Sequence, residues 1–199
     1  MERRGERGRR ATRAVSFGVS SATTPNASHR DRFGRTLRFL GESLPPPASL
    51  LDLGPDNVFA DQMREHRYTV ENTGRVDLDD HPEAAAREAD ALVAFEVLEH
   101  LVNPLSVLRE ARAPRLFASV PLRLWFASAY RNPEDRWDRH YHEFEAWQFD
   151  WLLEKAGWEI VRRERWVPRR TGMPTGLRPL LRTLVPRWYV VEARRPEGR

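Results

Sequence analysis

Three side chains that can do chemistry follow one apolar segment of the sequence. Residues 91–95 are all apolar, and Glu96, Glu99 and His100 come shortly after them. A short apolar run of this kind is typical of a strand that is buried on both faces of a parallel sheet. The carboxyl ends of such strands face the ligand crevice of an open sheet. The pattern therefore favours a functional site at this strand end, with ordinary solvated loop residues as the alternative.

A second group of titratable side chains lies at positions 140–143. His140, Tyr141, His142 and Glu143 are consecutive and come just before a predicted helix. The pKa of histidine lies near neutrality, so His140 and His142 are predicted as general bases toward a protonated acceptor. Structural pairing with carboxylates is the alternative for both rings. A metal site would need a third ligand that this spacing does not supply, so we expect no metal.

Strands and helices alternate along the middle of the chain. Apolar segments predict strands at 48–53, 68–72, 91–95, 115–120, 158–166 and 188–193, with a weaker strand at 75–78. Helical patterns occupy 31–44, 58–66, 105–112 and 145–156, with a helical turn or two in 82–89 and 177–184. This alternation requires crossover connections, which are typical of parallel α/β sheets.

The segment 122–142 interrupts the alternation. It is rich in Trp, Tyr, Arg and Asp, and it is longer than an ordinary connection between elements. Aromatic side chains such as Trp125 and Tyr141 could cover a flat or hydrophobic acceptor, or could form a small core of the loop itself. We predict a lid or substrate loop here, with His100, Tyr141 and Trp125 as substrate contacts.

The two ends of the chain are basic and the middle is acidic. Residues 1–38 and 162–199 carry net charges of +7 and +8, whereas residues 39–161 carry −11. Basic ends can bind nucleic acid through counterion release. They can also reflect a genome composition that favours arginine codons. The chain has 32 arginines and a single lysine, Lys155, and this ratio supports the codon explanation.

Length and composition exclude several classes of protein. A chain of 199 residues accommodates one domain with a sizeable core, and the absence of cysteine excludes disulfides and cysteine nucleophiles. No segment is apolar enough to span a bilayer or to act as a secretory signal, so we expect a cytoplasmic protein. We predict a disordered basic tail over 1–30, one domain over 31–195 and a Pro/Arg-rich excursion at 168–186.

Several segments resemble a known family in their order and spacing. They are Leu50-Leu-Asp-Leu-Gly54, the segment 89–101 followed by Asn103-Pro104, Ser119-Val-Pro121, and His142-Glu-Phe144 leading into 152–158. Over residues 45–166 the chain resembles the class I S-adenosylmethionine-dependent methyltransferases, in the small single-domain branch that methylates metabolites. The resemblance implies a Rossmann-like α/β fold. Its sheet would have seven mostly parallel strands, helices on both faces and an antiparallel last strand.

The resemblance also implies a set of residues that bind S-adenosylmethionine. They are Asp52, Gly54, Glu71, Asp77, Leu78, Phe95 and Glu96. Gly54 would let the first turn pass close to the methionine part of the cofactor, because a side chain there would occupy that space. Glu71 would accept hydrogen bonds from the ribose hydroxyls. Asp77 would meet the adenine amino group, with Asp79 and Asp80 as the alternatives for this role.

One loop departs from the family pattern. The second and fourth positions after Gly54 are usually glycines, but Asp56 and Val58 stand there in this chain. A carboxylate at position 56 would also lie near the carboxylate of the cofactor.

Methyl transfer to a small-molecule acceptor is the function that the family resemblance predicts first. A non-catalytic partner subunit of the same fold and a nucleic-acid-binding protein are the alternatives.

Overall fold

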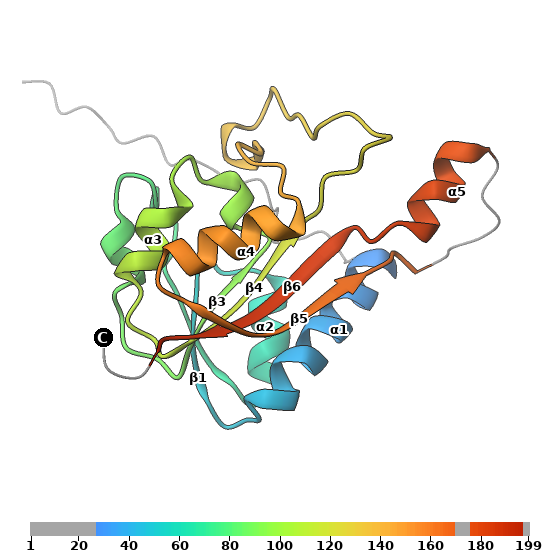
Figure 1. Ribbon diagram of the computed structural model, residues 1–199. Coiled ribbons are helices and arrows are strands. Elements are labelled where there is room, and N and C mark those ends of the chain that lie inside the picture. The colour runs from blue at the N-terminus through green and yellow to red at the C-terminus, as the bar shows by residue number, and fades with distance from the viewer. Residues whose placement is uncertain (1–26, 170–175, 197–199) are drawn as a thin grey trace, which may run out of the picture.

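The computed structural model describes residues 27–169 and 176–196, whose strands form one sheet in the order β2-β1-β3-β4-β6-β5 (Figure 1). The strands are β1 Ser49–Asp52, β2 Thr69–Asn72, β3 Ala91–Phe95, β4 Arg115–Pro121, β5 Glu159–Trp166 and β6 Trp188–Arg194. The α-helices are α1 Ala27–Ser43, α2 Val58–Glu65, α3 Pro104–Glu110, α4 Ala146–Lys155 and α5 Leu177–Leu184. Short 3₁₀ helices occupy η1 Pro82–Ala85, η2 Leu98–His100 and η3 Arg136–Asp138.

The sheet is mostly parallel, as the sequence predicted. β1 runs parallel to β2 and β3, and β3 runs parallel to β4. β6 runs antiparallel to both β4 and β5, so the last strand is the antiparallel one. The carboxyl ends of β1 and β3 consequently meet at one edge of the sheet, as the crossover pattern requires.

The described residues form six strands rather than the seven that were predicted. The segment 75–78, predicted as a weak strand, is irregular and leads into a turn. Asp77 accounts for the difference, because its side-chain oxygen accepts a hydrogen bond from Asp79 N at 3.2 Å and its carbonyl accepts one from His81 N at 2.9 Å. These local bonds replace the ladder bonds that a strand would make.

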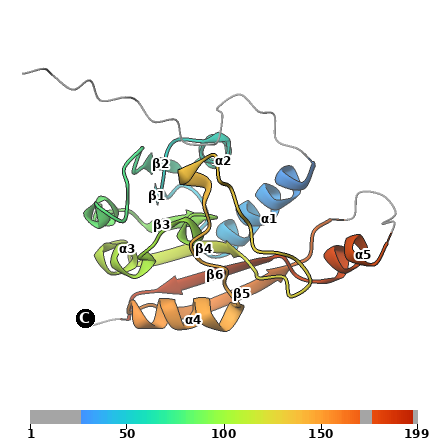
Figure 2. The same cartoon turned by 90° about the horizontal axis from the view of Figure 1, so that it is seen from above.

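Helices cover both faces of the sheet, with α1 and α2 on one side and α3 and α4 on the other (Figure 2). On the first face, Phe39 of α1 and Met63 of α2 are buried with Phe117 of β4. On the second face, Leu108 of α3 and Leu153 of α4 are buried in a larger cluster. The doubly wound arrangement predicted from the sequence is confirmed.

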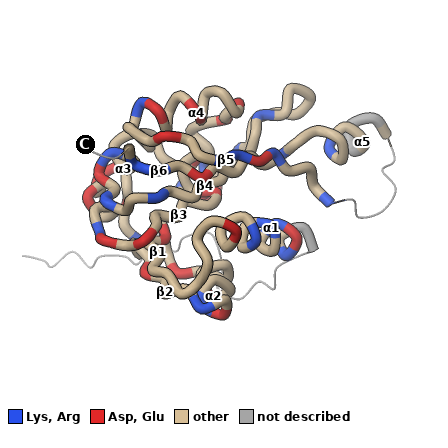
Figure 3. The backbone as a smooth tube through the Cα atoms, turned by 60° about the horizontal axis from the view of Figure 1, so that its bottom comes forward, with Lys and Arg blue, Asp and Glu red and all other residues tan. Residues whose placement is uncertain are grey.

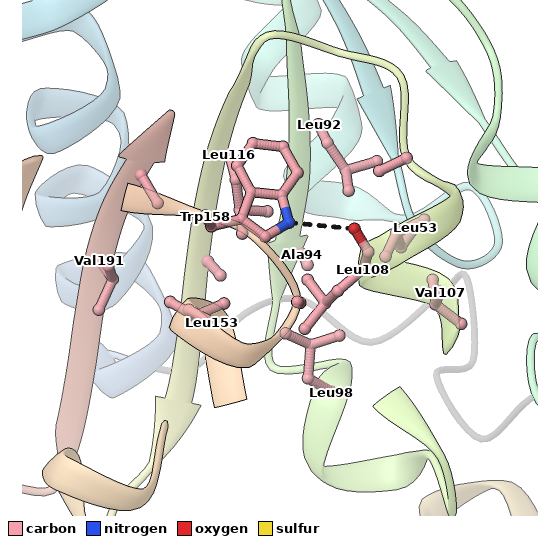
Figure 4. Close-up of a cluster of buried hydrophobic side chains, with 14 of the residues drawn as sticks. Leu53, Leu92, Ala94, Leu98, Val107, Leu108, Leu116, Leu153, Trp158 and Val191 are labelled. Carbon is pink, nitrogen blue, oxygen red and sulfur yellow. Dashed lines mark hydrogen bonds between the residues drawn. The ribbon is translucent and has the colours of Figure 1, made fainter. Parts of the chain in front are cut away.

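Trp158 joins α3 to the end of α4 within the second cluster (Figure 4). Its indole Nε1 donates a buried hydrogen bond to the carbonyl oxygen of Leu108 at 3.0 Å. The guanidinium of Arg195 lies 4.3 Å from the centroid of the Trp158 ring. The Trp158 side chain thus contacts both α3 and Arg195, which directly follows β6.

The edge strand β5 carries interspersed basic and acidic positions (Figure 3). Its residues 159–165 alternate between exposed and half-buried positions, and charges on an edge strand discourage pairing with a second chain. Beyond β5, α5 lies away from the sheet (Figure 1).

Across 27–169 and 176–196, none of the helices combines the length and apolar character that a membrane span requires. Residues 1–26 of the predicted tail and 170–175 of the excursion lie outside the described residues.

Candidate functional site

A cavity of about 380 Å³ lies where β1 and β3 end. Its wall combines the turn after β1, the segment 75–79 and the residues that follow β3. α1 contributes His29, Arg32, Phe33 and Thr36, and the long loop contributes 136–138 and Tyr141. Ser119 of β4 also lines the cavity, so six parts of the chain that are distant in sequence enclose one space.

The turn after β1 is built without the glycines of the family pattern. Gly54 has a φ of 106°, a conformation that side-chain-bearing residues rarely adopt. Its amide donates to Thr73 Oγ1 at 2.7 Å, which fastens the turn to the segment after β2. Asn57 caps α2 by accepting hydrogen bonds from the amides of Phe59 and Ala60. The cap ensures that α2 begins directly at the cavity wall.

The Asp56 carboxylate, which the family resemblance would place near the carboxylate of the cofactor, has a partner in the protein. Arg64 of α2 donates to it at 2.8 Å. The Asp56 side chain is about two-thirds exposed, at 66%, so water also solvates it. The ion pair and the exposure both reduce the repulsion that this carboxylate exerts on an anion in the cavity.

Asp52 is a buried carboxyl at the end of β1. Its side chain accepts a hydrogen bond from the Asn72 amide at 2.9 Å, and the residue is only 4% exposed. Burial disfavours the ionised form and raises the pKa of Asp52 to about 7, although the hydrogen bond from Asn72 acts in the opposite direction. A cationic group of a ligand would find a matching partner here.

Glu96 occupies a strained position directly after β3. Its φ is 58°, in the left-handed region that few residues other than glycine adopt. The side chain has two fixed partners: Arg32 Nη1 at 2.7 Å and Ser119 Oγ at 3.0 Å. Its neighbour Phe95 packs against Phe59 with ring centroids 5.5 Å apart. Left-handed backbone held by its surroundings is common at ligand sites.

The segment 77–79 supplies a mixed polar and apolar wall. Leu78 is 4% exposed and lines the cavity beside Asp77. Asp79 lies next to them and accepts hydrogen bonds from the backbone amides of Val102 and Asn103 at 2.9 and 2.7 Å. Asp79 thereby fixes the segment that leads into α3, a role that sequence reasoning did not assign.

The long loop reaches the cavity through its second half. Tyr141 N and His142 N both donate to the carbonyl of Glu99, at 2.8 and 3.2 Å. Tyr130 OH donates to the Asp138 carboxylate at 2.5 Å, which holds the loop together. The loop is therefore tied to η2, directly after the strand end that the sequence singled out.

Most of the predicted site residues lie at the cavity. Its lining includes Asp52, Gly54, Asp77, Leu78, Phe95, Glu96, His100 and Tyr141. Sequence reasoning missed Arg32, which also lines it, and did not single out Trp137 among the aromatic residues of the long loop. The amphipathic pattern of α1 was the available signal for the helix, but it did not show which surface the helix would cover.

Four predicted residues lie elsewhere. Glu71 does not line the cavity, and its carboxylate pairs with Arg87 at 2.5 Å. Trp125 is 76% exposed. The Nε2 atom of His142 lies 3.2 Å from the carbonyl oxygen of Val102, outside the cavity lining. His140 does not line the cavity but packs against His100, and burial lowers its pKa to about 4, so the ring is neutral near pH 7.

Most of the chain, including all residues that line the cavity, matches one protein family. Residues 27–163 match the family model described as a methyltransferase domain. The chain belongs to this methyltransferase family. The matched range of the methyltransferase domain begins at α1 and ends within β5, so it includes every element that lines the cavity. The family predicted from the sequence is confirmed.

Solved structures share the fold of this methyltransferase domain. The N-methyltransferase NodS of Bradyrhizobium japonicum, in complex with S-adenosylhomocysteine, is 15% identical with a TM-score of 0.55, over 86% of this chain and 89% of NodS. An S-adenosylmethionine-dependent methyltransferase of Mesorhizobium loti is 17% identical with a TM-score of 0.52, over 79% of this chain and 96% of that chain.

A third structure with this fold is named for an activity other than methyl transfer. The [4+2]-cyclase SpnF is 18% identical with a TM-score of 0.54, over 89% of this chain and 86% of SpnF. No curated protein matches the chain. At these identities the neighbours establish the fold of the methyltransferase domain, and its chemistry has to be argued from its own residues.

Proposed function

We propose that the cavity binds S-adenosylmethionine and that the protein transfers the methyl group to a small-molecule acceptor. The observation that carries the proposal is the position of the cavity at the ends of β1 and β3 in a chain of the methyltransferase family. Open α/β sheets bind their ligands at this edge.

The residues of the wall suit the separate parts of the cofactor. Asp52 is placed to accept a hydrogen bond from the ammonium of the methionine part, whose charge favours the ionised carboxylate. Asp77 is placed to accept one from the adenine amino group, while Leu78 offers an apolar surface to the ring. Gly54 leaves open space, because no heavy atom lies within 4 Å of where its Cβ would stand.

When bound, the cofactor supplies a methyl group on a sulfonium, which a nucleophile of the acceptor displaces in line. The protein contributes mainly by holding and desolvating the two partners, because proximity and orientation supply much of the rate of such a displacement. Phe95 and Glu96 lie at the strand end beside the expected position of the methyl donor. Trp137 and Tyr141 of the long loop complete the wall on the acceptor side.

The side chain proposed to contact the acceptor is that of His100. It lines the cavity, whereas His140 and His142 do not. The Nδ1 atom of His100 lies 3.1 Å from the carbonyl oxygen of Arg139 and must donate to it, because a carbonyl oxygen has no proton to give. Its Nε2 atom is thus left as an acceptor.

Incorporation of a labelled methyl group tests this function. The protein is incubated with methyl-labelled S-adenosylmethionine and a cell extract separated into small-molecule, nucleic-acid and protein fractions. The proposal predicts label in the small-molecule fraction, and less label with Asp52→Ala. Label in nucleic acid alone would support the nucleic-acid alternative. Cofactor binding without any labelled product would favour a non-catalytic partner subunit.

A further inference from the structure

We infer that Glu99, His100 and His140 form a binding site for a divalent transition-metal ion beside the cavity. One carboxylate oxygen of Glu99 and one ring nitrogen of each histidine all lie within 4.8 Å of one another. Glu99 and His100 come from η2, and His140 comes from the long loop. The fold thus joins two segments that the sequence separates by about 40 residues, and the site is distinct from the proposed cofactor contacts.

The Glu99 carboxylate lacks a partner that its burial requires. The residue is 1% exposed, and within the described part of the chain its Oε2 atom accepts no hydrogen bond. A buried carboxylate without a partner is costly, because desolvation is not compensated. A bound cation would provide the missing positive charge.

The His100 ring has the orientation that a metal ligand needs. Its Nδ1–H donates to the carbonyl oxygen of Arg139 at 3.1 Å, which leaves the lone pair of Nε2 available. Histidine ligands almost always donate their other ring nitrogen in this way, because the bond fixes the tautomer and the ring orientation. The available Nε2 lies 3.9 Å from Glu99 Oε1.

That separation is too long for a hydrogen bond, but it is compatible with two ligands of one ion. Zn²⁺ lies about 2.0–2.2 Å from nitrogen and oxygen ligands, so two ligand atoms at a tetrahedral angle are roughly 3.3–3.6 Å apart. The ligand atoms of the trio lie within 4.8 Å of one another, so the side chains would have to close by up to roughly 1.5 Å around the ion.

His140 supplies the third nitrogen from a fixed ring. Its ring lies edge to face with His100, with centroids 4.7 Å apart and an interplanar angle of 87°. On its other side the Tyr130 ring lies 4.5 Å away, centroid to centroid. A histidine binds a metal ion through its neutral imidazole ring.

The donor set indicates the class of ion. Two imidazole nitrogens and one carboxylate oxygen suit Zn²⁺ and Fe²⁺ rather than Ca²⁺ or Mg²⁺, which prefer oxygen ligands. Three protein ligands also leave coordination positions open, as in catalytic zinc sites. Because His100 lines the cavity, an ion bound to its Nε2 atom would meet the acceptor in place of that atom, through an open coordination position.

Titration of the full-length, tag-free protein with Zn²⁺ tests the site. After removal of metal with a chelator, calorimetry is expected to show one ion bound per chain. His140→Ala and Glu99→Gln should each weaken binding by at least about tenfold. Zn²⁺ should also raise the Tm of the wild type but not that of the double variant H100A/H140A, because a ligand of the folded state stabilises it.

His81→Ala is the matched control. His81 and Glu83 form a histidine–carboxylate pair at 3.1 Å, but both side chains are exposed, at 61% and 66%. This variant should bind Zn²⁺ as the wild type does. Circular dichroism verifies that each variant is folded, and His140→Ala decides the question if Glu99→Gln does not fold. Equal binding by the wild type and H100A/H140A, or no binding by the wild type at millimolar Zn²⁺, would overturn the inference.

Discussion

Arg32 and Glu96 stand 64 positions apart in the sequence and form an ion pair in which Nη1 and Oε2 are 2.7 Å apart. Arg32 belongs to α1, and Glu96 follows β3 in a left-handed conformation. Both residues line the cavity, and their side chains are about one-fifth exposed, at 20% and 19%. The ion pair therefore holds α1 against the end of β3 at the cavity.

Loss of this ion pair should weaken cofactor binding. In Arg32→Met the unbranched apolar part of the side chain is largely kept but the guanidinium is lost, so α1 is no longer held to Glu96. We expect several-fold lower affinity for S-adenosylhomocysteine by calorimetry, and a loss of about 1 kcal/mol in the free energy of unfolding. Arg35→Met is the control, because Arg35 pairs with Asp31 on the same helix and does not line the cavity. Equal affinity in the two variants would contradict this role of Arg32.

Asp52 should make stability depend on pH. Its pKa is about 7 in the folded protein and 3.8 as the ordinary value, so the folded state holds the proton more tightly. The stability of the wild type should therefore fall relative to Asp52→Asn as pH rises from 4 to 7, by on the order of 2–4 kcal/mol in total. Above about pH 8 the difference should be constant, because Asp52 is then ionised in both states. Urea unfolding of both proteins across this range measures it, and a flat difference would show that the carboxyl is not perturbed.

Two acidic residues should differ in their importance for the cofactor. Asp77 lines the cavity, whereas Glu71 pairs with Arg87 outside it. We expect Asp77→Asn to lower the affinity for S-adenosylmethionine about tenfold, as the loss of a hydrogen bond to a charged group commonly does. Glu71→Gln should stay within about twofold of the wild type. The reverse order would show that Glu71 holds the ribose, as the family resemblance implies.

Trp158 should affect stability without affecting the site. Trp158→Phe removes the indole hydrogen bond to the Leu108 carbonyl but keeps most of the buried ring. That carbonyl still accepts a hydrogen bond from Arg195 at 2.8 Å, so we expect a loss of only about 1–2 kcal/mol in unfolding free energy. Affinity for S-adenosylhomocysteine should not change, because Trp158 does not line the cavity. A large change in affinity would show that the second helix layer is coupled to the site.

The sequence predicted the sheet well because its strands are encoded locally. The apolar run of β3 and the polar residues after it are adjacent in the chain, and parallel pairing then places them at the edge where β1 also ends. The segment 75–78 was misjudged because Asp77 makes local hydrogen bonds that a hydrophobic pattern does not show. Its apolar residues Val76 and Leu78 line the cavity instead.

The long-range contacts of the site could not be predicted. The closure of α1 over the cavity depends on Arg32 meeting Glu96, which no periodicity encodes. His140 was judged with its neighbours His142 and Glu143, but in the fold it contacts His100. Which residues of a long loop meet a strand end depends on the path of the loop, and the composition of the loop does not specify that path.

The central claim is that the cavity binds S-adenosylmethionine, and titration calorimetry with S-adenosylmethionine and S-adenosylhomocysteine tests it most directly. The account predicts binding of one molecule per chain, weakened at least about tenfold by Asp52→Ala and unchanged by Glu110→Ala at the exposed end of α3. Absence of binding at millimolar ligand, or equal binding by both variants, would contradict it.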